Sequence, residues 1–271
     1  MRKLKGKKVL ITGAASGIGY HTAVSFAKEG SVLVLTDINE EGLKQAASEI
    51  EGFGVMVHTY VNDVSDLEAV QKLADDVIGK LGGIDVLVNN AGIGFSAEIK
   101  DTTMEDWKRL IGINVWGPIH FVTAFLPSMI SQRKGAIVNI SSGQAFFPVP
   151  TWGAYAATKF FLAGYSEALH YEVAQHGITV TTVFPFLVDS PFYSDIKADT
   201  IGSKMVLKMI PFIAASPEGT GRTIVNAVKK GKKNELHHLF NKLGFRLTRL
   251  VPFAFDGAGH ATALAMTMKK D

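Results

Sequence analysis

Short apolar runs alternate along the chain with longer stretches in which apolar residues recur at helical spacing. Strand-like and helix-like segments that alternate in this way predict a doubly wound parallel sheet flanked by helices, an α/β fold in a single domain. The clearest helix-like segments are 40–50, 67–81 and 103–130, the last interrupted by glycines. The strand-like runs are 8–12, 32–36, 54–61, 84–88, 136–140 and 178–184.

Composition narrows the class of protein. The 271 residues are 47% hydrophobic, which suits one large domain with a buried sheet. A formal net charge of +3 is too small to indicate a nucleic-acid partner. With no cysteine, disulfides, thiol nucleophiles and thiolate metal sites are excluded, and we expect no metal. No apolar stretch approaches the length of a membrane span, so a cytoplasmic protein is expected.

A glycine-rich turn, Thr12 to Gly19, joins the first strand to the first helix. Glycine allows a tight turn and close approach of a ligand, and the helix N-terminus offers unpaired amides to a pyrophosphate. The common dinucleotide fingerprint would place its third glycine at Thr22, so this turn departs from it. The flanking strand and helix favour nucleotide binding, and a simple tight turn is the alternative.

Asp37 ends the second strand at about the distance expected for an acid that binds the adenosine ribose. A carboxylate there would repel a 2′-phosphate, and Ala14, Ala15 and Ser16 supply no cation for one. Both observations favour NAD over NADP. A helix N-cap or loop aspartate is the alternative.

Tyr155 and Lys159 are four residues apart in a helical pattern, so they lie on one face. We expect the ammonium to lower the pKa of the phenol, and Ser142, which follows the preceding strand, to hold a substrate oxygen beside it. A solvated helix face is the alternative. Tyr193 and Lys197 have the same spacing without a serine-ended strand before them, so there we favour the solvated face.

Asn114 lies inside the long helical region 103–130. Asparagine is a poor residue within a helix because its amide competes with the backbone. It is either a satisfied core amide or a kink that aims a polar group at a bound water.

Taken in order, these elements resemble the classical branch of the short-chain dehydrogenase/reductase superfamily. The resemblance covers roughly residues 5–222. It implies a Rossmann-like fold and an NAD(H)-dependent oxidoreductase that transfers hydride between nicotinamide and a secondary alcohol or ketone. The motifs that carry it are the glycine turn, Asp63-Val64, Asn89 to Gly92, Asn114, Ser142, Tyr155 and Lys159.

The resemblance implies a role for each matching residue. Tyr155 would exchange the proton, Ser142 would orient the substrate oxygen, Lys159 would bind the nicotinamide ribose and tune Tyr155, and Asn114 would hold a water that links Lys159 to solvent. Ser141 would face away. The implied cofactor-binding residues are Gly13, Ser16, Gly17, Ile18, Gly19, Asp37, Asp63, Val64, Asn90, Ala91, Gly92, Tyr155, Lys159, Pro185, Val188 and Ser190.

Two departures from the family pattern stand out. Phe186 replaces the usual glycine after Pro185, and Ser190 stands where a threonine hydroxyl belongs. The usual seventh-strand signature is missing, and residues 234–239 are a candidate substitute strand. We expect residues 1–231 to form the domain, with a substrate lid at about 189–216, and 232–271 to form an atypical extension packed on it.

The candidate substrate-side residues are mostly apolar, which favours a small hydrophobic alcohol or ketone. The alternative is that several of them simply belong to the core. They are Gln144, Phe147, Trp152, Phe186 and Phe192.

An apolar helical stripe runs from Leu239 to Val251. It could be an added core helix, a subunit contact or an interfacial helix that makes the protein peripheral to a membrane. The long helices before Gln132 and after Ala154 resemble the family's dimer bundle, so a homodimer or homotetramer is expected.

Two other functions stay open: a catalytically silent dinucleotide-sensing protein, and a lyase or epimerase on the same scaffold.

Overall fold

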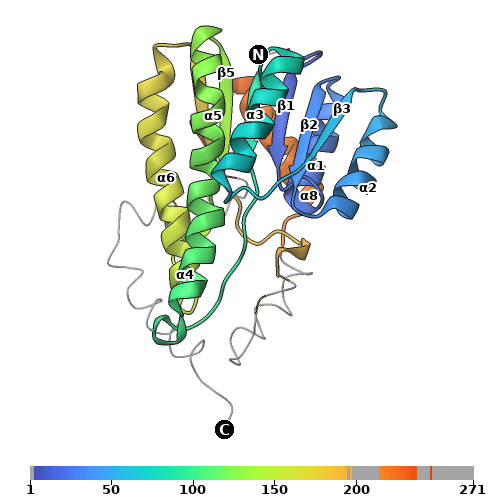
Figure 1. Cartoon of the computed structure of the whole chain (residues 1–271). Helices are drawn as coiled ribbons and strands as arrows, with labels where there is room; N and C mark the ends of the chain where they lie inside the picture. Colours follow the sequence, from blue (N-terminus) through green and yellow to red (C-terminus); the bar gives the residue numbers. More distant parts are fainter. Residues whose placement is uncertain (1–2, 194–195, 197–213, 237–244, 246–271) are drawn as a thin grey trace.

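The computed structural model describes residues 3–193, 196, 214–236 and 245 (Figure 1). Its centre is a seven-stranded parallel sheet with the strand order β3-β2-β1-β4-β5-β6-β7. The order reverses between β1 and β4, and ligands of such sheets bind at the carboxyl ends of the strands beside that switch point. The strands are β1 (Lys8–Thr12), β2 (Val32–Asp37), β3 (Val57–Val61), β4 (Val86–Asn89), β5 (Gly135–Ile140), β6 (Ile178–Phe184) and β7 (Asn234–Leu236).

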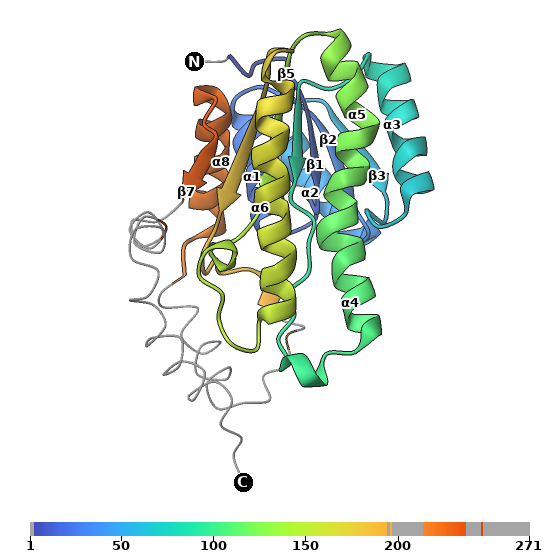
Figure 2. The same cartoon turned by 90° about the vertical axis from the view of Figure 1, so that its left-hand side faces the viewer.

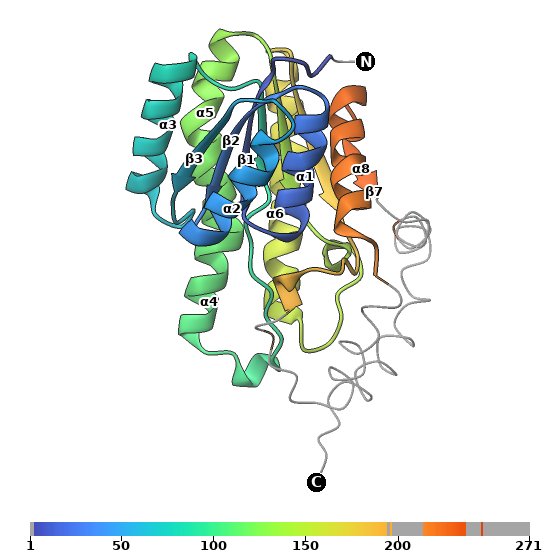
Figure 3. The ribbon, with the colours of Figure 1, turned by 90° about the vertical axis from the view of Figure 1, so that its right-hand side faces the viewer.

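Helices cover both faces of the sheet. Figure 2 shows the layer of α3 (Leu67–Leu81), α5 (Gly117–Ser131) and α6 (Gly153–Ala174). Figure 3 shows the opposite layer, which contains α1 (Gly17–Lys28), α2 (Glu40–Glu51) and α8 (Pro217–Lys230). Helix α4 (Met104–Ile111) continues into α5 through the π-helical turn η2 (Gly112–Trp116), and η1 (Ile99–Asp101), η3 (Gly143–Ala145) and η4 (Pro191–Tyr193) are single 3-10 turns.

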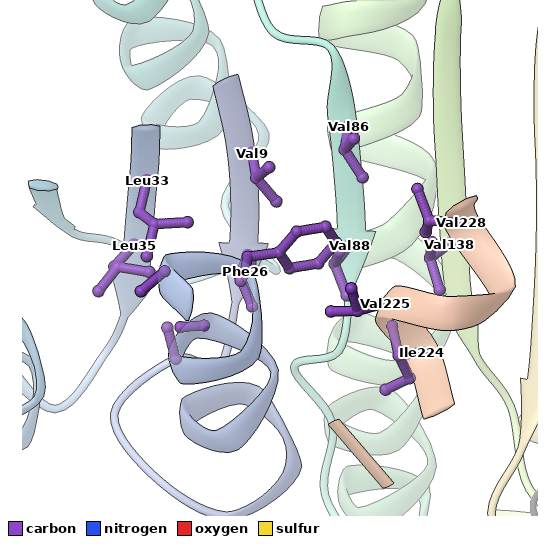
Figure 4. Packing of buried hydrophobic residues seen from close by; sticks show 14 of the residues in the cluster. Val9, Phe26, Leu33, Leu35, Val86, Val88, Val138, Ile224, Val225 and Val228 are labelled. Carbon is purple, nitrogen blue, oxygen red and sulfur yellow. The ribbon is translucent and has the colours of Figure 1, made fainter. Parts of the chain in front are cut away.

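Alternation of side chains along buried strands divides the core in two. In β1, Val9 and Ile11 face the α1/α2/α8 layer, and Leu10 between them faces the α3/α5/α6 layer. Phe26 of α1 is fully buried among strand and α8 side chains in the first core (Figure 4). Because both faces are covered, the central strands β1, β4 and β5 are mostly apolar and almost entirely buried, as is typical of parallel sheets.

The predicted fold class is confirmed, and several element bounds match. Helix α3 and strand β6 span the expected residues 67–81 and 178–184. The interruption expected in 103–130 is the π-helical turn. Within 234–239, residues 234–236 form β7 beside β6. Most of the expected lid, and the apolar stripe from Leu239 onward, lie outside the described residues.

The expectation that no apolar stretch approaches the length of a membrane span is wrong. The continuous helical segment Met104–Ser131 is long and apolar enough to cross a bilayer by length and composition alone. Its apolar residues have another use, because α5 packs against α3 and the sheet, where Phe121 and Phe125 are fully buried. We interpret the segment as a core helix.

Gly221 allows α8 to cross α1 closely. A Cβ at this position would lie 2.5 Å from the carbonyl oxygen of His21 and 2.8 Å from the amide nitrogen of Thr22, both backbone atoms. We expect Gly221→Ala to lower the free energy of unfolding by about 1–3 kcal/mol, because the helices must separate. Gly79 of α3 has open space around it, so Gly79→Ala should instead raise stability by about 0.5–1 kcal/mol. Urea unfolding followed by circular dichroism measures both, and equal effects would contradict the packing account.

Candidate active site

The glycine turn after β1 is packed backbone to backbone against the segment after β4. A Cβ on Gly13, whose φ is +64°, would lie 2.9 Å from Ala91 Cα, and one on Gly19 would lie 2.0 Å from the Gly13 carbonyl oxygen. Thr12 Oγ1 accepts hydrogen bonds from the amides of Asn90 and Ala91 at 3.0 and 2.9 Å. The Asn90 side chain donates back to the carbonyls of Thr12 and Gly13. Any larger side chain at Gly13 or Gly19 would force the two segments apart.

The N-terminus of α1 has the properties of an anion site. Its N-cap, Ser16, makes no side-chain capping hydrogen bond, and the first turn holds no acidic residue. The first amides of a helix lack intrahelical partners and lie at the positive end of its dipole. Ser16, Gly17 and Ile18 line the cleft, so these amides suit a phosphate group there.

Asp37 lies at the end of β2 and lines the same cleft. Its carboxylate accepts hydrogen bonds from the amides of Ala15 at 3.0 Å and Asn39 at 2.9 Å. The N-cap of α2 is Asn39, so the N-cap alternative for Asp37 is wrong. Among the described residues that line the cleft, Lys159 is the one lysine or arginine.

Ser142, Tyr155 and Lys159 converge at the carboxyl end of β5. Tyr155 and Lys159 are 6% and 4% exposed, and the lysine Nζ lies 5.6 Å from the centroid of the phenol ring. The same Nζ donates a hydrogen bond to the carbonyl of Ile140 at 3.0 Å. The Ser142 side chain hydrogen-bonds with Tyr155, whereas Ser141 Oγ donates to the main-chain carbonyl of Lys159 and so faces away as expected.

Burial controls the protonation of this pair. It raises the pKa of Tyr155 above its ordinary value, and the hydrogen bond with Ser142 opposes that rise. Burial also lowers the pKa of Lys159 to about 8. The pKa of Tyr155 therefore changes in the direction opposite to the expected lowering, because loss of solvation is the largest cause. The phenol is a proton donor at neutral pH.

Asn114 is a satisfied core amide in the π-helical turn. Its Nδ2 donates to the carbonyl of Ile93 at 3.0 Å and to Thr158 Oγ1 at 3.2 Å, and its Oδ1 accepts from the Ile93 amide at 2.9 Å. A Cβ on Gly92 would lie 3.1 Å from Asn114 Oδ1 and 3.5 Å from Lys159 Nζ. Asn114 thus fastens the segment after β4 beside Lys159, without lining the cleft itself.

The cleft has a volume of about 740 Å³ and brings most of the expected residues together. Gly19, Asn114 and Phe147 lie outside its described lining. The expected residues that line it are Gly13, Ser16, Gly17, Ile18, Asp37, Asp63, Val64, Asn90, Ala91, Gly92, Ser142, Gln144, Trp152, Tyr155, Lys159, Pro185, Phe186, Val188, Ser190 and Phe192.

Several lining residues had no signal in the sequence, among them Asn62, Ile93 and Val149, and Tyr193 lines the cleft although its spacing to Lys197 favoured a solvated face. Val149 is held by its amide, which donates to Gln144 Oε1 at 2.9 Å. That contact fixes the loop after β5, and periodicity does not report on loops. Tyr193 lies in the single turn η4, which is too short to show a helical pattern.

Three aromatic side chains form a cluster with Tyr155. Trp152 and Phe192 contact Tyr155 edge to face, with centroid distances of 5.6 and 5.7 Å, and Tyr193 contacts the same two rings at 6.4 and 5.2 Å. We call Trp152, Tyr155, Phe192 and Tyr193 the aromatic box. Gly94 makes room for it, since a Cβ there would lie 2.8 Å from the Phe192 ring.

Comparisons with known proteins agree with this geometry. Residues 7–200 match the family model for short chain dehydrogenases. The chain is 39% identical over 189 residues to the 3-oxoacyl-[acyl-carrier-protein] reductase FabG of Thermotoga maritima, covering 70% of this chain and 77% of the relative. It is 35% identical over 234 residues to the probable oxidoreductase EphD of Mycobacterium tuberculosis, covering 83% of this chain but 40% of that longer protein.

Among solved structures, the chain is similar to a short chain dehydrogenase/reductase from Burkholderia phymatum in complex with NAD. The TM-score is 0.85 at 26% identity, with 92% of this chain and 95% of the other covered. Fold and cleft together define a Rossmann-like domain with a crevice at the carboxyl edge of its sheet. The chain belongs to the short-chain dehydrogenase family.

The buried lysine gives stability a specific pH dependence. The pKa of Lys159 is about 8 in the folded chain against an ordinary 10.5. Between these values the unfolded chain binds more protons, so the folded chain gains stability as the pH rises. We expect wild type to gain about 3 kcal/mol relative to Lys159→Met between pH 8 and 10.5. Urea unfolding across this range tests it, with the exposed Lys72→Met as control for loss of a charge. A constant difference would contradict the account.

Proposed function

We propose that the protein is an NAD(H)-dependent oxidoreductase that transfers hydride between nicotinamide and a hydrophobic secondary alcohol or ketone, with Tyr155 as the general acid and base. The observation that carries the proposal is the meeting of Ser142, Tyr155 and Lys159 in the cleft that also holds the glycine turn and Asp37. These groups combine a dinucleotide site with a proton donor, which is what carbonyl reduction requires.

The residues present fit a dinucleotide. The uncapped start of α1 suits the pyrophosphate, and the free lone pairs of Asp37 suit a ribose hydroxyl. The negative charge of Asp37, with no cation in the described lining near it, supports NAD over NADP. Lys159 and Ser190, the latter beside Gly17, also line the cleft and supply polar groups for the nicotinamide half. When bound, the dinucleotide supplies or accepts the hydride.

The chain's own residues handle the proton and the position of the substrate. Ser142 Oγ and Tyr155 Oη hold the substrate oxygen between them. In the reductive direction Tyr155 donates its proton to that oxygen, and burial, which keeps the phenol protonated, suits this step. Lys159 stabilises the phenolate that remains, because a cation beside a buried anion lowers the energy of that charge. Asn114 acts as a positioning residue through its hydrogen bonds to Ile93.

Apolar side chains on the substrate side support a hydrophobic alcohol or ketone. Trp152, Phe186 and Phe192 line the cleft beyond Tyr155, and Val149 and Leu187 add to the same walls. A pocket of this kind holds a ligand through apolar contact and selects it through a few polar groups. The relatives include a 3-oxoacyl-[acyl-carrier-protein] reductase, which is consistent with a carbonyl substrate.

Assembly, location and domain layout stay predictions. A homo-oligomer is supported by a groove of about 390 Å³ between α5 and α6, lined by apolar side chains such as Leu126 and Tyr165. Trp116, Phe160 and Phe161 are about half exposed on the same helical layer.

We place the protein in the cytoplasm, and assign residues 1–231 to the domain and 232–271 to its extension.

Removal of one oxygen atom tests the role of Tyr155. We expect Tyr155→Phe to lower kcat/KM for ketone reduction by about 100- to 10,000-fold, because the proton donor is lost. Binding of NADH, followed by its fluorescence, should stay within about twofold, because that oxygen is a small part of the dinucleotide site. Tyr171→Phe, on the exposed face of α6, is the matched control. Retained turnover in Tyr155→Phe would rule out the assigned role, and normal binding without turnover in wild type would favour the dinucleotide-sensing alternative.

Loss of one negative charge tests cofactor choice. Asp37→Asn keeps an acceptor oxygen for the turn but removes the repulsion toward a 2′-phosphate. We expect affinity for NADPH to rise and affinity for NADH to fall, each by about tenfold, as for one hydrogen bond to a charged group. Fluorescence titration with both dinucleotides measures this, and Asp75→Asn on exposed α3 controls for net charge. An unchanged ratio of the two affinities would remove Asp37 from the ribose site.

A further inference from the structure

Tyr193 is a second phenol in the substrate side of the cleft. The sequence favours a solvated helix face for it, and the structure shows otherwise. Its ring lies 5.2 Å from that of Phe192 and 6.4 Å from that of Trp152, and both of those rings also contact Tyr155. Tyr193 lines the cleft and packs against the buried cluster of Trp152, Tyr155 and Ile196. One ligand seated at Tyr155 can therefore reach both phenols.

With respect to the residues that the structure describes, the hydroxyl of Tyr193 is available as a hydrogen-bond donor. The main-chain amide of Val188 faces its oxygen, and within the described part of the chain no acceptor takes its proton. Burial raises the pKa of Tyr193 to about 12, so the phenol keeps its proton at physiological pH. A donor in a partly buried site without an acceptor costs free energy that a ligand oxygen would recover.

Most of the other residues on the substrate side of the cleft are apolar, and the polar Gln144 already accepts a hydrogen bond from the Val149 amide through its Oε1. Val149, Phe186, Leu187 and Ile93 line the cleft together with the rings of the aromatic box. Ser142 and Tyr155 are already assigned to the reacting oxygen. A phenylalanine at 193 would complete an apolar pocket with the same ring contacts, so the one feature that the tyrosine adds is a directed polar group.

We infer that Tyr193 is a specificity-determining residue whose hydroxyl donates a hydrogen bond to a second oxygen of the substrate. The preferred substrates are then hydrophobic ketones or alcohols that carry another carbonyl, ester or hydroxyl oxygen a few bonds from the reacting carbon. The inference rests on the proposed function and adds the substrate class to it. A site built to hydrogen-bond a substrate oxygen discriminates strongly against an analogue that lacks it.

Three phenyl ketones that differ in the second oxygen test this inference. Propiophenone has none, phenylpropanedione has it on the adjacent carbon, and ethyl benzoylacetate has it one carbon further. Of phenylpropanedione and ethyl benzoylacetate, the test uses the one that wild type reduces faster. For that ketone we expect Tyr193→Phe to lower kcat/KM by about 10- to 100-fold, and for propiophenone by less than about threefold. Comparing the variant with wild type on each ketone cancels the different intrinsic reactivities of the three compounds.

Two controls separate specificity from structure. Tyr171→Phe removes the same atom from an exposed tyrosine and should leave all three values unchanged. Melting temperature and NADH affinity of Tyr193→Phe should equal those of wild type, and Tyr193→Leu should lose the same discrimination. An equal loss on all three ketones, or no loss on any, overturns the inference while leaving the proposed function intact. If wild type reduces none of them with NADH, the proposed function and this inference fall together.

Discussion

The contact between two turns determines where everything else in the cleft lies. The turn after β1 and the segment after β4 touch through backbone atoms, because Gly13 and Gly19 bring no side chain between them. Hydrogen bonds between Thr12 and Asn90 close the contact from both sides. Since β1 and β4 flank the point where the strand order reverses, this contact fixes the crevice in which the start of α1 faces the end of β5.

Loss of solvation determines the protonation of Tyr155 and Lys159 in this crevice. Tyr155 and Lys159 lie where solvent hardly reaches, so burial favours the uncharged form of each. A phenol that keeps its proton at neutral pH, beside a lysine whose pKa is lowered to about 8, is suited to donate that proton and to have the phenolate stabilised. Burial of the Lys159 charge also lowers the stability of the folded chain, as is common at functional sites. The apolar contacts of the two packed cores compensate for this loss.

Patterns that depend on local spacing could be read from the sequence, and contacts between distant segments could not. The bounds of α3 follow from its apolar spacing together with the cap at Asp66 and the left-handed Gly82. The shared face of Tyr155 and Lys159 follows from helical geometry. The direction of their pKa changes depends on packing, which spacing does not report. Asn114 finds its partner in Ile93, 21 residues away, and Tyr193 reaches the cleft from a single 3-10 turn without periodicity.

The most direct test of the account follows the hydride. Wild-type protein is incubated with ethyl benzoylacetate and NADH that carries two deuterium atoms at the nicotinamide carbon from which hydride leaves, and the product is analysed by mass spectrometry and NMR. The account predicts one deuterium on the new carbinol carbon for each NAD formed, and a proton on its oxygen. A reduced product without deuterium at that carbon, or loss of NADH without a reduced product, would contradict it.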